Sequence, residues 1–316
     1  MPAYTTLLDV IKSNAANRSG IGMIDEVSRR TPFMSRGAFR SIKGINFKTL
    51  VQTGASNTLG SFRKLNSGVA TSVSLEENRL VETYPIQPRF HVDAQVAMNS
   101  EDGAQAFIAR KVQGILLTEF IAHEKQMFYG AASGLANALG YPGLLDAYDP
   151  VNMVTDAGGT TASTGSSVWL VNFGNDSVQG VLANGGQFQF GNVRLESLPD
   201  AGGQNYLDMY VQTLLAQVGL QVANILRVAR IKKLTADSGK GLTDLLLMTA
   251  ITQFQQVQPN AIFMSLRSLA QLRNSRTATN PTGTEAPFPT SVVGVDGGDI
   301  PIYPTAGILN TESLTL

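Results

Sequence analysis

The chain has 316 residues, with 24 Lys plus Arg against 24 Asp plus Glu, so its formal net charge is zero. Charged residues make up only 15%, below the ~25% usual for globular domains, which suggests that part of the surface meets other protein molecules. Zero net charge argues against a dedicated nucleic-acid-binding protein and favours self-association. The absence of cysteine excludes disulfides, thiolate catalysis and cysteine-ligated zinc.

No targeting or membrane segment is predicted. The N-terminus lacks the basic stretch and apolar run of a signal peptide. The longest apolar run, residues 115–122, is interrupted by Glu119 and is too short to cross a bilayer. We therefore expect a soluble protein that is made in the cytosol and has no membrane partner.

Residues 1–44 are expected to form an N-terminal arm. Residues 4–16 can form a short amphipathic helix with Leu7, Leu8 and Ile11 on one side. The stretch that follows has no sustained periodicity. The alternative is a mobile terminus.

Residues 45–92 are predicted to form an extended β-hairpin. Apolar residues alternate along Val69–Leu75, and turn residues occur at 54–57 and 66–68. Four charged residues on this ribbon are candidates for contacts between subunits, namely Arg63, Lys64, Glu76 and Glu77. The alternative is an ordinary exposed hairpin.

Residues 100–129 are predicted to form one long helix. Asn99 or Ser100 can cap its start and Gly130 can end it. At ~1.5 Å per residue it would be about 45 Å long. Its first half should lie on a sheet and its second half should be enclosed, because apolar residues cover one side of the first half and nearly all of the second. The residues expected to pack are Phe107, Ile108, Val112, Ile115 and Phe120.

The rest of the chain alternates short elements with polar loops. Loops are predicted at 130–165 and 275–289, and helix or mixed structure at 206–231. A helix is predicted over 242–254 with Thr243 as its cap, and another over 266–274. Strands are predicted at 168–173, 178–182, 188–195 and 261–264, followed by two strands joined by a turn between 292 and 309.

No arrangement of residues predicts catalysis, a metal or a cofactor. His123-Glu124 begins like a helical zinc-protease motif, but position 127 is Met where the second histidine is needed. There is no Gly-x-Ser-x-Gly nucleophile motif. Residues 237–241 are similar to a phosphate-binding loop only in part, because Gly241 stands where Ser or Thr is required. A turn before the helix at Thr243 explains that segment.

Three stretches carry a family resemblance. The first is the end of the long helix, Glu124–Gly130, with the glycine-rich segment 131–143. The second runs from Ser167–Val171 to Arg230-Ile231, and the third contains Pro259–Ser265 and Ile300–Pro304. In this order they resemble the major capsid proteins of tailed double-stranded DNA bacteriophages, in particular those of several short-tailed phages.

The resemblance implies an α+β chain with the Hong Kong 97-like capsid fold. Its parts would be an N-terminal arm (1–44), an extended loop (45–92), a peripheral domain with the spine helix (93–135 and 255–316) and an axial domain (136–254). One departure is the short N-terminus, since the family often carries a long scaffolding extension there. Whether a separate scaffolding protein is needed stays open.

The resemblance also implies the function. The chain would be a structural protein without enzymatic activity, assembling with itself as hexamers and pentamers into an icosahedral shell. Further partners would be a portal protein, with a scaffolding and a decoration (cement) protein as options, and packaged DNA held without sequence-specific contact. It would be assembled in the host bacterial cytoplasm and reside in the virion. The alternatives are an encapsulin-like compartment and, more remotely, a hydrolase.

Overall fold

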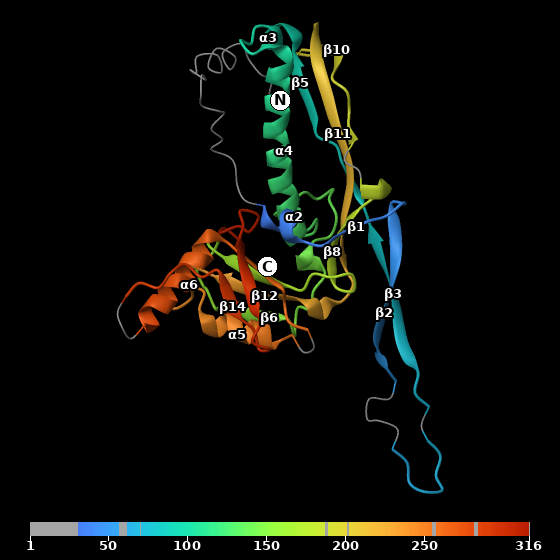
Figure 1. Ribbon diagram of the computed structural model, residues 1–316, viewed down its shortest axis with the longest axis vertical. Helices are drawn as coiled ribbons and strands as arrows, with labels where there is room; N and C mark the ends of the chain where they lie inside the picture. Colours follow the sequence, from blue (N-terminus) through green and yellow to red (C-terminus); the bar gives the residue numbers. More distant parts are fainter. Residues whose placement is uncertain are drawn as a thin grey trace.

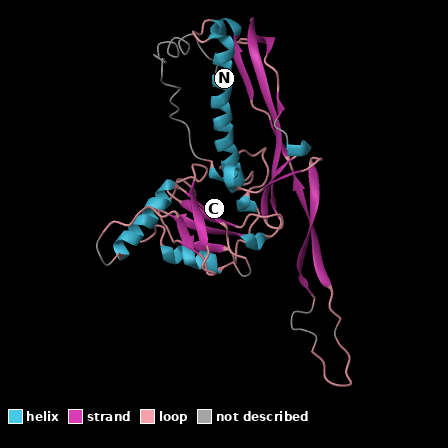
Figure 2. Cartoon of the chain, in the orientation of Figure 1, coloured by secondary structure: helices cyan, strands magenta, loops and turns pink. Residues whose placement is uncertain are grey.

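The computed structural model describes residues 31–56, 62–69, 71–186, 189–200, 202–254, 257–280 and 284–315. The helix expected over 4–16 lies outside them. Three parts are visible in Figure 1: a long helix lying along a sheet, a second sheet flanked by helices, and a thin hairpin that projects away from both. In Figure 2 the described part of the hairpin is drawn as strand and loop.

The first part is built on a long strand, β11 (Tyr206–Val222). Its N-terminal half pairs with β10 (Arg194–Pro199) on one side and β5 (Arg89–Asp93) on the other. Its C-terminal half pairs with β8 (Val178–Leu182) and β4 (Tyr84–Ile86), and β9 (Gln189–Phe190) pairs near its middle. β1 (Phe39–Ser41) runs parallel to β8. Residues 206–222 are therefore strand, and the expected helix or mixed structure is wrong there.

The helix on this sheet is α4 (Gly103–Tyr129), preceded by the short helix α3 (Ala94–Met98). The expected caps at Asn99 and Ser100 are wrong, because Asn99 closes α3 and Asp102 precedes the first turn of α4 without a capping side-chain bond. Gly130 ends the helix as predicted, with φ of 68°, a conformation that favours glycine.

The packing of α4 changes along its length. Phe107 and Ile108 are buried against Phe90 and Val92 of β5. Val112 and Ile115 are only partly buried beside this cluster. The last turn is enclosed, and its buried aromatic residues meet Phe33 of α2 (Pro32–Arg36) and Trp169. Phe120 differs from the expectation, since 37% of it is exposed in the single chain.

The second part is a six-stranded sheet in the order β14-β15-β13-β7-β12-β6. Its central strands β7 and β13 are buried at every position, because helices and loops cover both faces. The strands are β6 (Val154–Asp156), β7 (Ser166–Val171), β12 (Val228–Leu234), β13 (Ala261–Met264), β14 (Ser291–Val293) and β15 (Asp299–Pro304).

Two helices flank this sheet, α5 (Asp244–Thr252) and α6 (Leu266–Thr279). The predicted cap of α5 is confirmed, because the Thr243 hydroxyl accepts a hydrogen bond from the Leu246 N–H at 3.3 Å. Short 3-10 helices lie at Leu144–Asp146, Asn184–Gly186 and Ile225–Arg227.

The strand pairing cuts across the expected domain division. That division groups 255–316 with the spine helix and separates both from 136–254. Instead, β13 pairs with β7, so residues 261–304 share one sheet with residues 154–171 and 228–234. Residues 209–218 of β11, by contrast, pair with β4 and β5 beside α4. The chain therefore crosses between the two parts more often than the expected division allows.

Candidate assembly interface

The projecting hairpin, called the arm below, consists of β2 (Asn46–Ala55), β3 (Ser74–Glu82) and the chain between them. Its two strands pair only with each other. Large apolar side chains near its tip are almost fully exposed, with 96% for Phe62 and 91% for Leu65. Exposed apolar residues near the tip of a projecting ribbon indicate a surface that another molecule covers.

The register assigns the side chains of the arm to two faces. Val51 lies opposite Glu77, and Gln52 lies opposite Glu76. Because successive side chains of a strand point to opposite faces, Glu76 and Glu77 lie on different sides of the arm. A single partner surface therefore cannot contact both carboxylates in the same way.

Three contacts hold the base of the arm. Arg79 donates to the Ala223 carbonyl at 2.8 Å, next to the end of β11. The Arg40 guanidinium lies 5.0 Å from the ring centre of Phe47, and Thr83 donates to the Ile45 carbonyl at 2.6 Å. Sequence reasoning missed Arg79. The sequence feature that could have pointed to Arg79 is that it is the one cation in β3, whose other charged residues are glutamates.

A cleft of about 550 Å³ separates the arm from the six-stranded sheet. Its lining includes Val51 and Arg79 from the arm, and Asp149, Asn224 and Gln253 from the body. The arm is therefore attached at its base and stands clear of the body beyond it.

The four charged residues proposed from the sequence are all exposed on the arm. Arg63 donates to the Ser67 carbonyl at 3.3 Å, and neither Arg63 nor Lys64 forms an ion pair within the described part of the chain. Glu77 is 3.5 Å from Arg79, and Glu76 accepts from the Ser74 hydroxyl at 3.4 Å. The arm brings all four onto one projecting ribbon.

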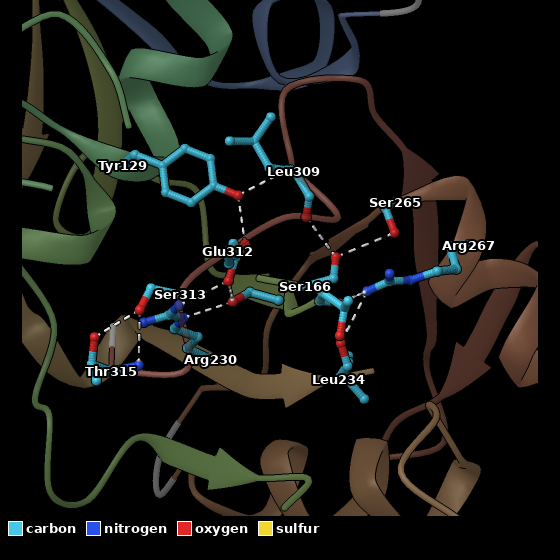
Figure 3. A network of polar contacts seen from close by, with 12 residues as sticks. Tyr129, Ser166, Arg230, Leu234, Ser265, Arg267, Leu309, Glu312, Ser313 and Thr315 are labelled. Atoms are coloured by element: carbon cyan, nitrogen blue, oxygen red, sulfur yellow. Dashed lines mark hydrogen bonds and ion pairs between the residues drawn. The ribbon is translucent and has the colours of Figure 1, made fainter. Parts of the chain in front are cut away.

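A buried polar network, called the junction network below, joins the end of α4 to the second sheet and to the C-terminal segment (Figure 3). The Glu312 carboxylate lies 3.1 Å from the Arg230 guanidinium and accepts from the hydroxyls of Tyr129 and Ser167 at 2.5 Å each. The Tyr129 hydroxyl in turn accepts from the Leu309 N–H at 2.8 Å. Burial, followed by the nearby carboxylate, raises the pKa of Tyr129, which therefore stays a neutral donor.

A second buried carboxylate, that of Glu124, lies on α4 itself, before Tyr129. Glu124 accepts from the Phe33 N–H at 2.8 Å and from the Thr305 hydroxyl at 2.9 Å, so it ties α2 and the end of β15 to the helix. Burial raises the pKa of Glu124 to about 7, although both hydrogen bonds lower it. Burial lowers the pKa of its neighbour His123 to about 4, and this imidazole lies 3.1 Å from the Tyr141 hydroxyl.

Glu124→Gln is expected to change how stability depends on pH. The pKa of Glu124 rises from 4.5 to about 7 on folding, so the stability linked to its proton is present below pH 4.5 and is lost as the pH rises through 7. The parent should therefore lose up to about 3 kcal/mol of unfolding free energy across this window relative to Gln, which stays neutral. The lowered pKa of His123 makes stability increase with pH, but it affects the parent and the variant equally. Denaturant unfolding from pH 4.5 to 8 measures the difference, and parallel pH profiles would contradict it.

The described residues hold no group of three or more His, Asp or Glu that could bind a metal ion. None of their helices is both long and apolar enough to cross a membrane. The segment similar to a phosphate loop is a turn, because the Lys240 N–H donates to the Asp237 carbonyl at 3.0 Å. The Asp237 carboxylate accepts from the N–H groups of Thr160 and Thr161 at 3.1 Å each.

A long helix on a narrow sheet, a second buried sheet and a projecting two-stranded arm together define the Hong Kong 97-like capsid fold. A solved structure of bacteriophage Epsilon15 matches this chain with a TM-score of 0.67 and 18% identity, covering 99% of this chain and 98% of the other. The family model described as Major capsid protein GP7 matches residues 29–315, so the chain belongs to this family. It is a structural subunit of a tailed-phage capsid shell.

Two other solved structures match more weakly. The procapsid of bacteriophage JBD30 has a TM-score of 0.45 and 11% identity, covering 87% of this chain and 91% of the other. The SrpI encapsulin of Synechococcus elongatus has a TM-score of 0.48 and 8% identity, covering 73% and 96%. No curated protein sequence matches the chain. The family match places the chain with phage capsid proteins, which is the first of the functions expected from its sequence.

Proposed function

We propose that this chain assembles as hexamers and pentamers that close into an icosahedral shell, and that the arm of each subunit lies over an adjacent subunit. The supporting observation is that both faces of the arm are open beyond its base. A two-stranded ribbon is marginally stable in water unless another surface orders it. A neighbouring copy supplies that surface at every position of a closed ring.

In this assembly the charges of the arm fix its register on the neighbour. Arg63 and Lys64 meet acidic groups, and Glu76 and Glu77 meet basic groups on two different surfaces, because they lie on opposite faces. Charges at the rim of an interface contribute more to specificity and association rate than to affinity. Glu76 then contacts the surface on one side of the arm and Glu77 the surface on the other.

The two sheets take different places in the shell. The second sheet with α5 and α6 is the axial domain, and α4 with the sheet around β11 is the peripheral domain. This reassigns residues 261–304 to the axial side and residues 189–222 to the peripheral side. The supporting observation is the strand pairing, which joins β13 to β7 and β11 to β5.

The shell encloses double-stranded DNA without sequence-specific contact. The chain has no excess of Lys and Arg to release counterions from DNA, which supports this part of the proposal. A portal protein completes the shell, and separate scaffolding and decoration proteins remain candidates. The subunit is assembled in the host cytoplasm, resides in the virion and performs no catalysis.

Replacing residues 57–72 with a short Gly-Ser turn is expected to abolish shell formation and to leave the subunit folded. The change keeps the last bonds of the ribbon, in which the Ser56 N–H donates to the Val73 carbonyl at 2.9 Å. It removes Phe62, Arg63, Lys64 and Leu65. Sedimentation and electron microscopy, with any scaffolding protein supplied, measure assembly, and thermal unfolding measures folding.

The matched control keeps the length of the arm and reverses only its charges, with Arg63→Glu and Lys64→Glu. This variant should assemble more slowly than the parent but retain shells at high salt, because screening weakens repulsion between exposed charges. Normal shells from the shortened arm would show that the main interface lies elsewhere.

A further inference from the structure

A free strand edge lies at the far end of the first sheet. β10 is the outermost strand beside β11, and Figure 1 shows it at the end of the molecule near α3. Four of its six residues are exposed, including Leu195 at 56%. An exposed strand edge presents unpaired N–H and C=O groups to which another strand can bond.

The hydrogen bonds of β11 show which groups of β10 point outward. Residues 200 and 205 continue the register of the two strands, and the Asp200 N–H donates to the Asn205 carbonyl at 2.7 Å. Bonded pairs in an antiparallel ladder recur at every second residue. Leu198, Glu196 and Arg194 therefore bond to β11. The backbone groups of Leu195 and Ser197 point away from the sheet and have no backbone partner within the described part of the chain.

The sequence of this edge is complementary to itself in one antiparallel register. When two copies meet about a two-fold axis through Leu195, each Leu195 N–H donates to the Leu195 carbonyl of the partner subunit. Arg194 then lies opposite Glu196 of the partner subunit, and the reverse pair follows by symmetry. Shifted registers are worse, because they place Glu196 opposite itself, Arg194 opposite itself, or Leu195 opposite Pro199, which has no N–H to donate.

The charged side chains on this face of β10 are compatible with pairing between two copies. Glu196 lies 2.7 Å from Arg89 and also contacts Arg194 within the same chain. Adding a second copy in the favoured register alternates positive and negative side chains across the axis. Each carboxylate then gains a cation without losing the one it has.

We propose that β10 pairs with β10 of a second copy about a local two-fold axis and that this contact joins neighbouring rings of subunits. A two-fold contact uses the same patch on both copies, so it cannot repeat head-to-tail around a ring. This inference rests on the proposed shell function and adds a second interface to it. The arm builds the rings, and the β10 edge connects them.

The absence of cysteine from the parent allows a direct test by cross-linking. In Leu195→Cys the two new thiols face each other across the axis, with Cα atoms about 5.5 Å apart in a bonded pair, within the range for a disulfide. In the matched control Ser197→Cys the two positions are offset by four residues, about 13 Å along the strand. After oxidation, shells of Leu195→Cys should give covalent dimers on a non-reducing denaturing gel. Shells of Ser197→Cys should give only monomeric chains on the same gel.

Absence of dimers in Leu195→Cys shells, or equal cross-linking of both variants, would overturn the proposal. A second variant, Leu195→Pro, removes an outward N–H and no bond to β11. It should form rings but few closed shells, which electron microscopy distinguishes. Closed shells of Leu195→Pro in normal yield would also overturn the proposal. If Leu195→Pro does not fold, the comparison of Leu195→Cys with Ser197→Cys tests the proposal alone. A failure of the proposed function of the arm is distinguishable from these results, because in that case the variant with the shortened arm would still form shells.

Discussion

Glu312→Ala is expected to lower the free energy of unfolding by about 3–5 kcal/mol, the usual cost of removing one partner from a buried ion pair. Glu312 and Arg230 have side chains only 2% and 1% exposed. The substitution leaves the Arg230 charge buried without its carboxylate and removes the acceptor of Tyr129 and Ser167. Because Tyr129 is the last residue of α4, the loss also loosens the helix from the second sheet.

Denaturant unfolding of the isolated subunit measures this effect. The matched control is Glu285→Ala, which removes a carboxylate paired with Arg273 but 79% exposed. It should cost about 0–1 kcal/mol, because water screens an exposed pair. A second comparison replaces both buried charges, with Arg230→Met and Glu312→Leu, and should restore much of the lost stability. Equal effects of Glu312→Ala and Glu285→Ala would contradict the assignment of the junction network as a stabilising feature.

Ile108→Asp is expected to prevent stable folding of the first part of the molecule. Ile108 is 2% exposed and packs in the cluster between α4 and β5. An aspartate there places a charge among apolar side chains and should cost on the order of 3 kcal/mol or more. The variant should be insoluble, or soluble only with a much lower melting temperature.

Two positions on the same helix provide the controls. Ala109→Asp changes the exposed neighbour of Ile108 and should leave the melting temperature within a few degrees of the parent. Ile115→Asp should have an intermediate effect on the isolated subunit, because Ile115 is only partly buried. Circular dichroism melts compare the three variants. Similar melting temperatures for Ile108→Asp and Ala109→Asp would show that α4 does not pack on β5 through this face.

The candidate interface was located from the sequence only in outline. The sequence predicted a hairpin over residues 45–92 and the charged residues on it. The hairpin ends at Glu82, because β4 and β5 pair with β11, and the expected turn at Gly54 lies within β2.

The arrangement of the charged residues could not be predicted, because it depends on the register of β2 against β3. That register places Glu76 and Glu77 on opposite faces and Arg79 at the base of the arm. The outward direction of Leu195 likewise depends on which residues of β10 bond to β11.

The sequence by itself determined the elements whose signals are local. Gly130 ends the long helix, Thr243 caps α5, and the apolar run Ala261–Met264 is a strand with the predicted bounds. Each of these features depends on residues only a few positions away, so it can be predicted without knowing the tertiary structure. The order of the segments also supported the capsid family before any contact was known.

The tertiary structure decided what distant segments do together. Residues 206–222 are not clearly periodic, and they form a strand because β4, β5, β8, β9 and β10 bond to them from remote parts of the chain. Arg230 and Glu312 are 82 residues apart and meet only because the C-terminal segment packs across the second sheet. Pairing of this kind depends on contacts that no local pattern encodes, since backbone propensity is weak and tertiary packing overrides it.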